Sequence, residues 1–490
     1  MPLVSLPGVP VRRLPEVRRV AARGRTPVLA LPVGAGGMLV SAVPEDLREV
    51  LEAFLADSGH TGKAGTVQSL PRPTLTPSVV HLVGIGDGDE AGWRAAGAAL
   101  ARAVASKPRA ALELPDGLAS GAVRGLVEGL LLAAYRYTLA ADAEPPTLKR
   151  IDIVAAEVDE DEVAAARAVA EATWTARDLV NTPGSVKSPD WLAKAAVKAA
   201  SAHGVTAVVR EPDRLAAEGF GGILAVGGGS VRGPRLVELT WAPRGARRHA
   251  VLVGKGITFD TGGISIKPGP GMGLMKKDMG GAAAVLGAVL GAAALRLPVK
   301  VTGLLAIAEN MPSGSAYRPG DVVRHHGGRT SEILNTDAEG RVVLADALAY
   351  ASARLKPDVL VDLATLTGAQ SVALGKRTAA LFSDSDDLAD SLAAAAAQAG
   401  ERVWRMPLHP DYVAELKSEV ADLNNAAGNP GAVTAALYLR EFAGAAADRW
   451  AHLDMSGPAW SDKADGELAR GATGWGVRTL VRWLEGLAAA

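Results

Sequence analysis

Short, continuously apolar runs that end in glycine-rich turns recur from about residue 185 to residue 490, and they constrain the fold more than any other feature. Several of these runs lack the alternation of polar and apolar residues that is typical of a strand with one solvent-exposed face. They therefore favour a largely parallel sheet covered by helices on both faces. In such a sheet the functional side chains lie beyond the carboxyl ends of the strands. We predict strands at Gly222–Val226, Arg248–Val253, Lys300–Ile307, Val359–Leu363 and Trp450–Asp454.

The first 150 residues alternate short strand-like runs with alanine-rich helical runs, and they predict a smaller N-terminal α/β domain. An alanine-rich helix follows, which proline and glycine end near Pro183, and we expect it to connect this domain to a larger α/β domain with a mixed sheet. The predicted parts are residues 1–160, 161–182 and 183–490. The first part is expected to contain strands Pro77–Gly84 and Arg150–Ala155 and helices Glu90–Ala105 and Gly121–Ala140.

The composition excludes several classes of protein. The 490 residues contain no cysteine, which rules out disulfides, thiolate metal sites and cysteine nucleophiles, so any metal must be held by oxygen or nitrogen. The formal net charge of −1 argues against a chain built as a whole to coat nucleic acid or an acidic membrane.

The apolar stretch Met279–Leu295 is too short to span a bilayer and predicts a buried helix. The proline-rich N-terminus lacks the apolar core of a signal peptide, so we expect a cytoplasmic protein.

A first cluster of charged residues follows a predicted strand. Lys255 and Asp260 come at its end among glycines, Lys267 follows, and Asp278 directly precedes the Gly/Ala-rich helix. Taken alone, Asp278 is explained as a cap of that helix and Lys255 as a surface lysine. The apolar, glycine-rich surroundings of Lys255 make a purely solvated role less natural.

A second cluster is the segment NTDAEGR, residues 335–341. Its Thr336 and Glu339 have the spacing of a capping box, which by itself would account for them. This reading does not explain Asp337 and Arg341, which would point to the same side as Glu339 if the backbone were extended. Together the two clusters supply four carboxylates and three basic groups without histidine, a donor set that suits two divalent cations such as Mg²⁺, Mn²⁺ or Zn²⁺.

These segments carry a resemblance to a known family. VGKGITFDTGGISIKPGPGMGLMKKDMGGAAAV and NTDAEGR closely resemble the leucyl aminopeptidases, the cytosolic aminopeptidases with two metal ions. The resemblance extends over most of residues 170–490, through ARDLVNTP (176–183), DLATLTG (362–368) and HLD (452–454). The first 150 residues resemble the family only in layout.

The resemblance implies a function and a set of partners. It implies hydrolysis of amino-terminal residues, preferably leucine and other apolar ones, from peptides by a bridging water that two divalent ions, Mn²⁺ or Zn²⁺, activate. It also implies a homohexamer. One metal would be held by Lys255, Asp260, Asp278 and Glu339. The second metal would be held by Asp260, by Glu339, and by the carboxylate and main-chain carbonyl of Asp337.

The resemblance also assigns roles to the remaining residues. Lys267 would stay cationic and polarise the scissile carbonyl. Arg341 would hold a bicarbonate ion that acts as the general base. The pocket for the first side chain would be lined by Met275, Thr365 and Gly368.

Two alternatives remain open at this level. Some members of the family also bind DNA, and a sequence-specific DNA-binding role would use an arginine-rich N-terminal patch, for which a solvated surface is the plainer interpretation. The chain could also be a non-catalytic structural homologue. The patch consists of Arg12, Arg13, Arg18, Arg19, Arg23 and Arg25.

Overall fold

The computed structural model describes all residues except 1–5, 7–8, 10–12, 143, 145 and 490, so Arg12 of the predicted patch lies outside the described residues. The chain forms two compact units. The first contains the described residues from 13 to 174 together with Asp462–Arg470, and the second contains Leu6 and Val9, Thr175–Ser461 and residues 471–489. Helix α4 (Glu160–Asn181) contributes residues to both units. The predicted domain ranges stay a prediction.

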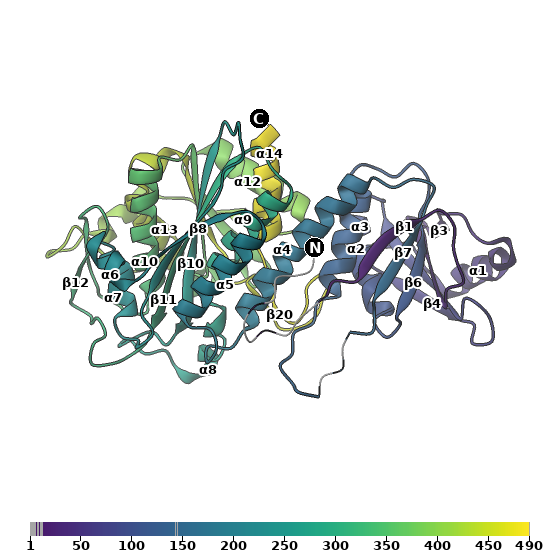
Figure 1. Cartoon of the computed structure of the whole chain (residues 1–490), viewed down its shortest axis with the longest axis horizontal. Coiled ribbons are helices and arrows are strands. Elements are labelled where there is room, and N and C mark those ends of the chain that lie inside the picture. Colours follow the sequence, from purple (N-terminus) through teal and green to yellow (C-terminus); the bar gives the residue numbers. More distant parts are fainter. Residues whose placement is uncertain (1–5, 7–8, 10–12, 143, 145, 490) are drawn as a thin grey trace. The chain divides into compact units, whose positions relative to one another are not determined.

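The first unit is built on a seven-stranded sheet in the order β1-β7-β6-β2-β5-β4, with β3 beside β2 (Figure 1). The strands from β1 to β5 in this order are parallel, and β4 and β3 are antiparallel to their neighbours. Helices α2 and α3 cover one face, where a large apolar core forms, and α1 covers a smaller core on the other face. The elements are β1 (Glu16–Val20), β2 (Val28–Gly34), β3 (Met38–Leu39), α1 (Glu45–Ser58), β4 (Val67–Pro71), β5 (Val79–Gly86), α2 (Glu90–Ala103), β6 (Arg109–Glu113), α3 (Ala122–Ala133) and β7 (Arg150–Val154).

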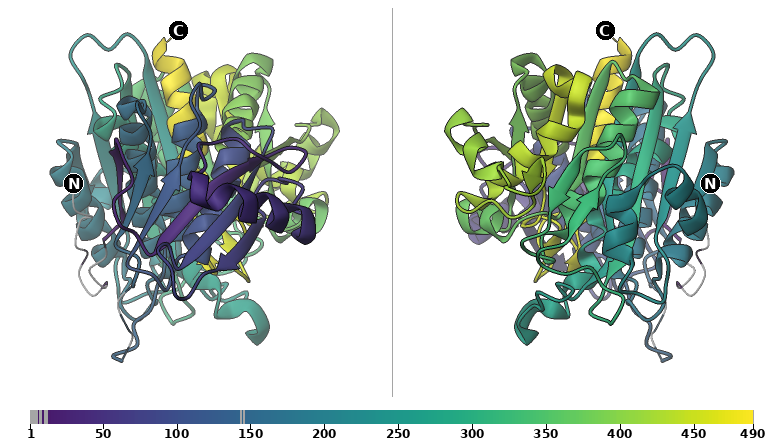
Figure 2. Two further views of the ribbon diagram at one scale, coloured as in Figure 1. Left: turned by 90° about the vertical axis from the view of Figure 1, so that its right-hand side faces the viewer. Right: turned by 90° about the vertical axis from the view of Figure 1, so that its left-hand side faces the viewer.

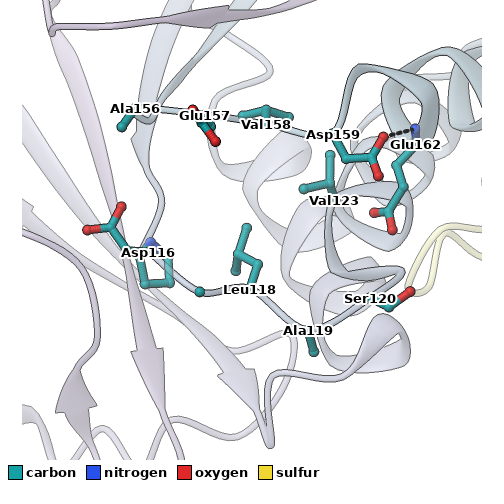
Figure 3. A pocket seen from close by; sticks show the side chains of 12 residues that line it. Asp116, Leu118, Ala119, Ser120, Val123, Ala156, Glu157, Val158, Asp159 and Glu162 are labelled. Atoms are coloured by element: carbon teal, nitrogen blue, oxygen red, sulfur yellow. Dashed lines mark hydrogen bonds between the residues drawn. The ribbon is translucent and has the colours of Figure 1, made fainter.

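A hollow of about 790 Å³ lies at the carboxyl ends of β6 and β7 (Figure 3). Two of its acidic side chains cap helices: Asp159 accepts from the main-chain nitrogen of Glu162, and Glu162 accepts from those of Gly121 and Arg124 at the start of α3. Capping therefore accounts for these carboxylates, and we assign no chemistry to the hollow.

The second unit is built on an eight-stranded mixed sheet in the order β16-β15-β18-β14-β10-β11-β9-β8. The central strands β18, β14, β10 and β11 are parallel, whereas β9, β8 and β15 introduce antiparallel pairs. The strands are β8 (Thr206–Arg210), β9 (Arg235–Trp241), β10 (His249–Asp260), β11 (Lys300–Asn310), β14 (Val359–Ala364), β15 (Thr378–Ser383), β16 (Arg402–Arg405) and β18 (Trp450–Asp454).

Helices cover both faces of this sheet, as predicted (Figures 1 and 2). On one face lie α5 (Pro189–Ala202), α9 (Gly280–Ala294), α12 (Asp386–Ala399) and α14 (Val477–Ala489), and on the other lie α7 (Gly221–Gly227), α10 (Glu339–Tyr350) and α13 (Gly431–Ala443). The second face packs into one continuous apolar core. Within the described residues, no helix is long and apolar enough to cross a bilayer.

Small residues let the Gly/Ala-rich helix α9 lie directly on the sheet. A Cβ on Gly281 would come within 2.1 Å of the Leu363 carbonyl oxygen, and a Cβ on Gly254 within 2.6 Å of Ala282 Cα. The prediction of a buried helix in this stretch is confirmed, because fourteen of its fifteen residues are buried. The close approach brings the residues just before the helix to the end of β10.

Several predicted elements need correction. Residues 222–226 do not form a strand but belong to α7, because a five-residue apolar run has no period that separates a strand from a buried helix. The helix predicted to reach residue 140 ends at Ala133, since the segment after it carries exposed polar residues. The strand predicted to end at Val253 continues to Asp260, so that both Lys255 and Asp260 lie in β10.

Candidate metal centre

The carboxyl ends of the parallel strands meet at one edge of the sheet and bring polar residues together. Asp260 ends β10 and is paired in register with Asn310, which ends β11. Thr365 directly follows β14, and Asp454 ends β18. All four side chains are at least nine-tenths buried. This is the edge at which open α/β sheets bind ligands.

The second predicted cluster reaches the same edge. Asp337 lies in the loop that follows β13 (Thr330–Glu332), and Glu339 is the first residue of α10. Ligand oxygens of Asp260, Asp337 and Glu339 lie within 4.8 Å of one another. The structure thus joins acidic groups from two distant stretches of the sequence.

Lys255 lies at the centre of the buried part of this site. Its Nζ is 2.8 Å from Glu339 Oε1 and 2.9 Å from Asp278 Oδ2, and it donates to the main-chain oxygen of Thr365 at 3.0 Å. Gly340 leaves room for this side chain, because a Cβ at residue 340 would come within 2.5 Å of Lys255 Cε and would displace it. Burial lowers the pKa of Lys255, but the surrounding carboxylates outweigh this effect and raise it.

Lys267 lies on the more open side of the site, where its side chain is 19% exposed. Its Nζ is 2.8 Å from Asp260 Oδ2 and also contacts Asp337 Oδ1. The turn that returns Lys267 to the site passes through Gly262 and Gly263 at φ +87° and +64°, a region that favours glycine. As with Lys255, the neighbouring carboxylates overcome the effect of burial and raise the pKa of Lys267.

The carboxylates repel one another in this buried setting. Burial and the charge of Asp260 raise the pKa of Glu339 to about 7, and the same two causes raise the pKa of Asp337 to about 6. Closely spaced anions of this kind need a compensating cation. Since the donors are mostly carboxylate oxygens and three of them converge, the residues fit divalent metal ions.

These pKa values predict a pH dependence of metal binding. Because the folded-state pKa values of Glu339 and Asp337 exceed their ordinary values, the metal-free fold holds extra protons between about pH 4.5 and 7 and loses stability as pH rises through that window. Mn²⁺ must displace these protons below pH 7, so the rise in Tm at a fixed Mn²⁺ concentration is expected to be larger at pH 8 than at pH 5.5. Differential scanning calorimetry of chelator-treated protein with and without Mn²⁺ measures this difference. An equal shift at both pH values would contradict the prediction.

The other predicted site residues lie around this centre. Met275 begins the short helix η1 (Met275–Lys277), three residues before Asp278, and is half-buried. Thr365 donates to Asp278 Oδ1 at 2.7 Å, and Gly368 is exposed at the start of α11 (Gly368–Leu374). Arg341 is buried in α10 and donates to the Asn425 carbonyl oxygen at 2.9 Å, while its buried Nε has no hydrogen-bond partner among the described residues.

Three interpretations of local structure were wrong. Asp278 does not cap α9, whose N-cap is Met279; its Oδ1 instead accepts from Lys255. Thr336 forms no capping box, since its hydroxyl donates to the Gly262 carbonyl oxygen at 2.7 Å. The acidic segment is not extended through Arg341, because α10 begins at Glu339. In the first two cases a tertiary contact replaced the local one.

Sequence reasoning missed two asparagines that hold the acidic loop. Asn310 Nδ2 donates to Asp260 Oδ1 at 2.8 Å and to the Thr336 carbonyl oxygen at 3.0 Å, so one amide connects the two clusters. Asn425 holds the loop from the other side, with its Nδ2 2.8 Å from the Asn335 carbonyl oxygen. The available signal for Asn310 was a polar residue three positions beyond the predicted strand Lys300–Ile307, which in the structure extends to Asn310 as β11.

Replacing Asn310 by leucine is expected to weaken Mn²⁺ binding by about 10–100-fold, because Asp260 and the acidic loop lose their shared donor. Isothermal titration calorimetry of the metal-free protein measures the affinity. Gln68→Leu, on the exposed side of β4, is the control and should bind Mn²⁺ like the unaltered chain. Unchanged affinity in Asn310→Leu would refute the positioning role.

Two arginines of the N-terminal patch are paired with carboxylates. Arg18 Nε is 2.9 Å from Asp152, and Arg23 is 4.0 Å from Glu113, whereas Arg19 donates to a main-chain oxygen and keeps its full charge. The two ion pairs reduce the positive charge that a nucleic-acid surface would need.

A mixed α/β sheet whose carboxyl edge gathers carboxylates and lysines fits the class of metal-dependent hydrolases. Comparison with known proteins gives the family. Residues 174–481 match the catalytic domain and residues 30–139 the N-terminal domain of the cytosol aminopeptidase family. The chain therefore belongs to the cytosol aminopeptidase family, and it is a metal-dependent aminopeptidase, as predicted.

Individual relatives agree over almost the whole chain. The probable cytosol aminopeptidase of Micrococcus luteus is 45% identical and that of Syntrophotalea carbinolica also 45%, covering 94% and 89% of this chain and 96% and 90% of those proteins. A tomato leucine aminopeptidase mutant has a TM-score of 0.86, with 32% identity and coverage of 98% of both chains. The bottromycin maturation enzyme BotP in complex with Mn has a TM-score of 0.85, with 40% identity, and covers 94% of this chain and 99% of its own. The predicted two-domain α/β fold is confirmed.

Proposed function

We propose that this aminopeptidase uses two divalent cations, Mn²⁺ or Zn²⁺, and prefers peptides that begin with leucine or another apolar residue. The convergence of Asp260, Asp337 and Glu339 within 4.8 Å, beside the buried Lys255–Asp278 pair, carries this proposal. In the proposed arrangement Asp260 and Glu339 would each serve as ligands of both ions. Lys255 and Asp278 complete one set of ligands, and the Asp337 carboxylate and carbonyl complete the other.

When bound, the cations would supply Lewis acidity and a water molecule with a lowered pKa. The protein supplies the remaining groups. Lys255 must give up its proton to act as a ligand, whereas Lys267 keeps its proton and donates to the carbonyl oxygen of the scissile bond, where negative charge develops. Arg341, whose buried Nε has no partner within the described part of the chain, would hold a bicarbonate ion as general base. Met275, Thr365 and Gly368 would line the pocket for the first side chain.

Metal analysis combined with an activity assay tests the proposal. The chain is incubated with Mn²⁺, gel-filtered and analysed for metal, and its kcat/KM is measured with the p-nitroanilides of leucine, alanine and glutamate. The proposal expects two ions per chain, loss of activity after chelation, and fastest hydrolysis of the leucine substrate. One ion per fully active chain would overturn the dinuclear centre, and equal rates on all three anilides would overturn the preference.

We further propose that the protein is a homohexamer and works in the cytoplasm on peptides. The complete set of carboxylates and lysines speaks against a non-catalytic homologue, and the paired arginines of the N-terminal patch speak against a DNA-binding role. Sedimentation equilibrium would separate a hexamer from smaller assemblies.

A further inference from the structure

Lys187 is a fully buried lysine that the proposed chemistry does not use. It lies in the turn between α4 and α5 and is 0% exposed. Its Nζ donates to the main-chain oxygens of Leu179 at 2.9 Å and Val180 at 3.1 Å, both in the last turn of α4, and to that of Lys276 in η1 at 2.6 Å. All three ammonium donors are therefore directed at carbonyl groups. Within the described part of the chain, Nζ forms no ion pair with a carboxylate.

Burying a charged lysine away from water costs free energy, which hydrogen bonds to its ammonium group must offset. Burial lowers the pKa of Lys187 well below the ordinary value. An apolar side chain of similar size is often tolerated where a buried ionic group is removed with its partners. The unpaired carbonyls at the carboxyl end of a helix attract a cation, which accounts for two of the three bonds. The third bond, to Lys276, reaches into the segment that carries Asp278.

The segment before Asp278 has few other anchors. Residues 268–274 are largely exposed, and a Cβ on Gly269, Gly271 or Gly273 would meet no atom within 4 Å. Residues 268–274 therefore do little to hold η1 in place. Contacts of η1 itself hold it: Lys187 donates to the carbonyl oxygen of Lys276, and the side chains of Lys276 and Lys277 donate to the carbonyl oxygens of Asn181 and Ser456.

We propose that Lys187 is a positioning residue that fixes η1 against the end of α4 and thereby sets the places of Asp278 and Met275. The inference rests on the proposed function, in which Asp278 is a metal ligand and Met275 lines the first side-chain pocket. Asp278 follows the anchored Lys276 by two residues, and its main-chain nitrogen donates to the Met275 carbonyl oxygen at 3.1 Å. Displacement of η1 would therefore change the metal centre and the pocket together.

Lys187→Met tests the proposal, because it keeps the apolar stem and removes every donor. We expect Mn²⁺ affinity, followed by the electron paramagnetic resonance signal of free Mn²⁺, to fall at least tenfold. The ratio of kcat/KM for leucine to that for alanine p-nitroanilide should fall at least threefold, since the pocket shifts with η1. Lys198→Met, an exposed lysine on α5, is the matched control and should leave both values unchanged.

A second variant separates positioning from folding. Glutamine is one bond shorter than lysine and carries two amide N–H donors, so Lys187→Gln keeps a buried polar side chain but cannot donate to all three carbonyls. It should fold, as circular dichroism would show, and still lose Mn²⁺ affinity and selectivity. If Lys187→Gln lowers only Tm and leaves both values at the wild-type level, the lysine is merely structural and the inference is overturned. A wild-type chain that binds no Mn²⁺ would instead overturn the proposed function, and this inference with it.

Discussion

Replacement of Glu339 by glutamine is expected to lower kcat/KM for leucine p-nitroanilide at least 1,000-fold, about 4 kcal/mol of transition-state stabilisation. Glu339 is 1% exposed, its Oε1 is 2.8 Å from Lys255, and its carboxylate belongs to the cluster with Asp260 and Asp337. In the proposed centre it bridges both ions, so one neutral amide weakens two sites at once. Metal analysis of Glu339→Gln should therefore find fewer than two Mn²⁺ per chain.

The control for this variant is Glu415→Gln, which changes an exposed glutamate in the same unit. It should retain the activity and metal content of the unaltered protein. Glu339→Gln with two bound ions and normal kcat/KM would contradict the assignment of Glu339 as a bridging ligand.

Lys267→Met is expected to lower kcat 100–1,000-fold while leaving the Mn²⁺ content unchanged, whereas Lys255→Met should lose metal as well as activity. The reason is their different surroundings. Lys255 is buried between Asp278 and Glu339, where a neutral amine would be a ligand, but Lys267 is partly exposed beside Asp260 and Asp337, where a substrate can reach it. Removing the Lys267 ammonium also removes a competitor for these two carboxylates, so Mn²⁺ should bind at least as tightly.

Both lysine variants are compared by metal analysis, calorimetric titration with Mn²⁺ and steady-state kinetics. Lys417→Met, at an exposed position, controls for loss of a positive charge. Loss of Mn²⁺ in parallel with activity in Lys267→Met would place Lys267 among the ligands and refute its role at the carbonyl.

Much of the fold could be predicted from apolar runs in the sequence. The strands that became β10, β11, β14 and β18 are largely apolar because both faces of the sheet are covered, and this composition can be recognised in the sequence without knowing which strands are neighbours. The error at residues 222–226 arose because so short a run fits a strand or a buried helix equally well. Its helical state is fixed by contacts such as that of the Ile223 main-chain nitrogen with Asp346 Oδ2 at 2.9 Å.

The candidate site could likewise be predicted from the sequence only in part. The motifs indicated a chemical role for one set of residues, because neither helix capping nor solvation explains why these charged groups occur together. The set is Lys255, Asp260, Asp278, Asp337 and Glu339. Local rules nevertheless misread Asp278 and Thr336 as helix caps, because each side chain finds its partner in a segment far away in the sequence. Asn310 had only its place beyond a predicted strand as a signal, and Lys187 stood in no motif that the sequence analysis recognised.

The sequence by itself determined which groups are available: a cysteine-free set of carboxylates and lysines, placed next to strands that must be buried. Only the tertiary structure decided their distances, because the parallel strands bring their carboxyl ends to one edge and α10 delivers Glu339 to the same place. Hydrogen bonds from Asn310 and Lys187 then hold the segments that carry the acidic groups. The physical reason is that a metal centre needs oxygens within a few ångströms of each other, and the order of residues along a chain does not specify such proximity.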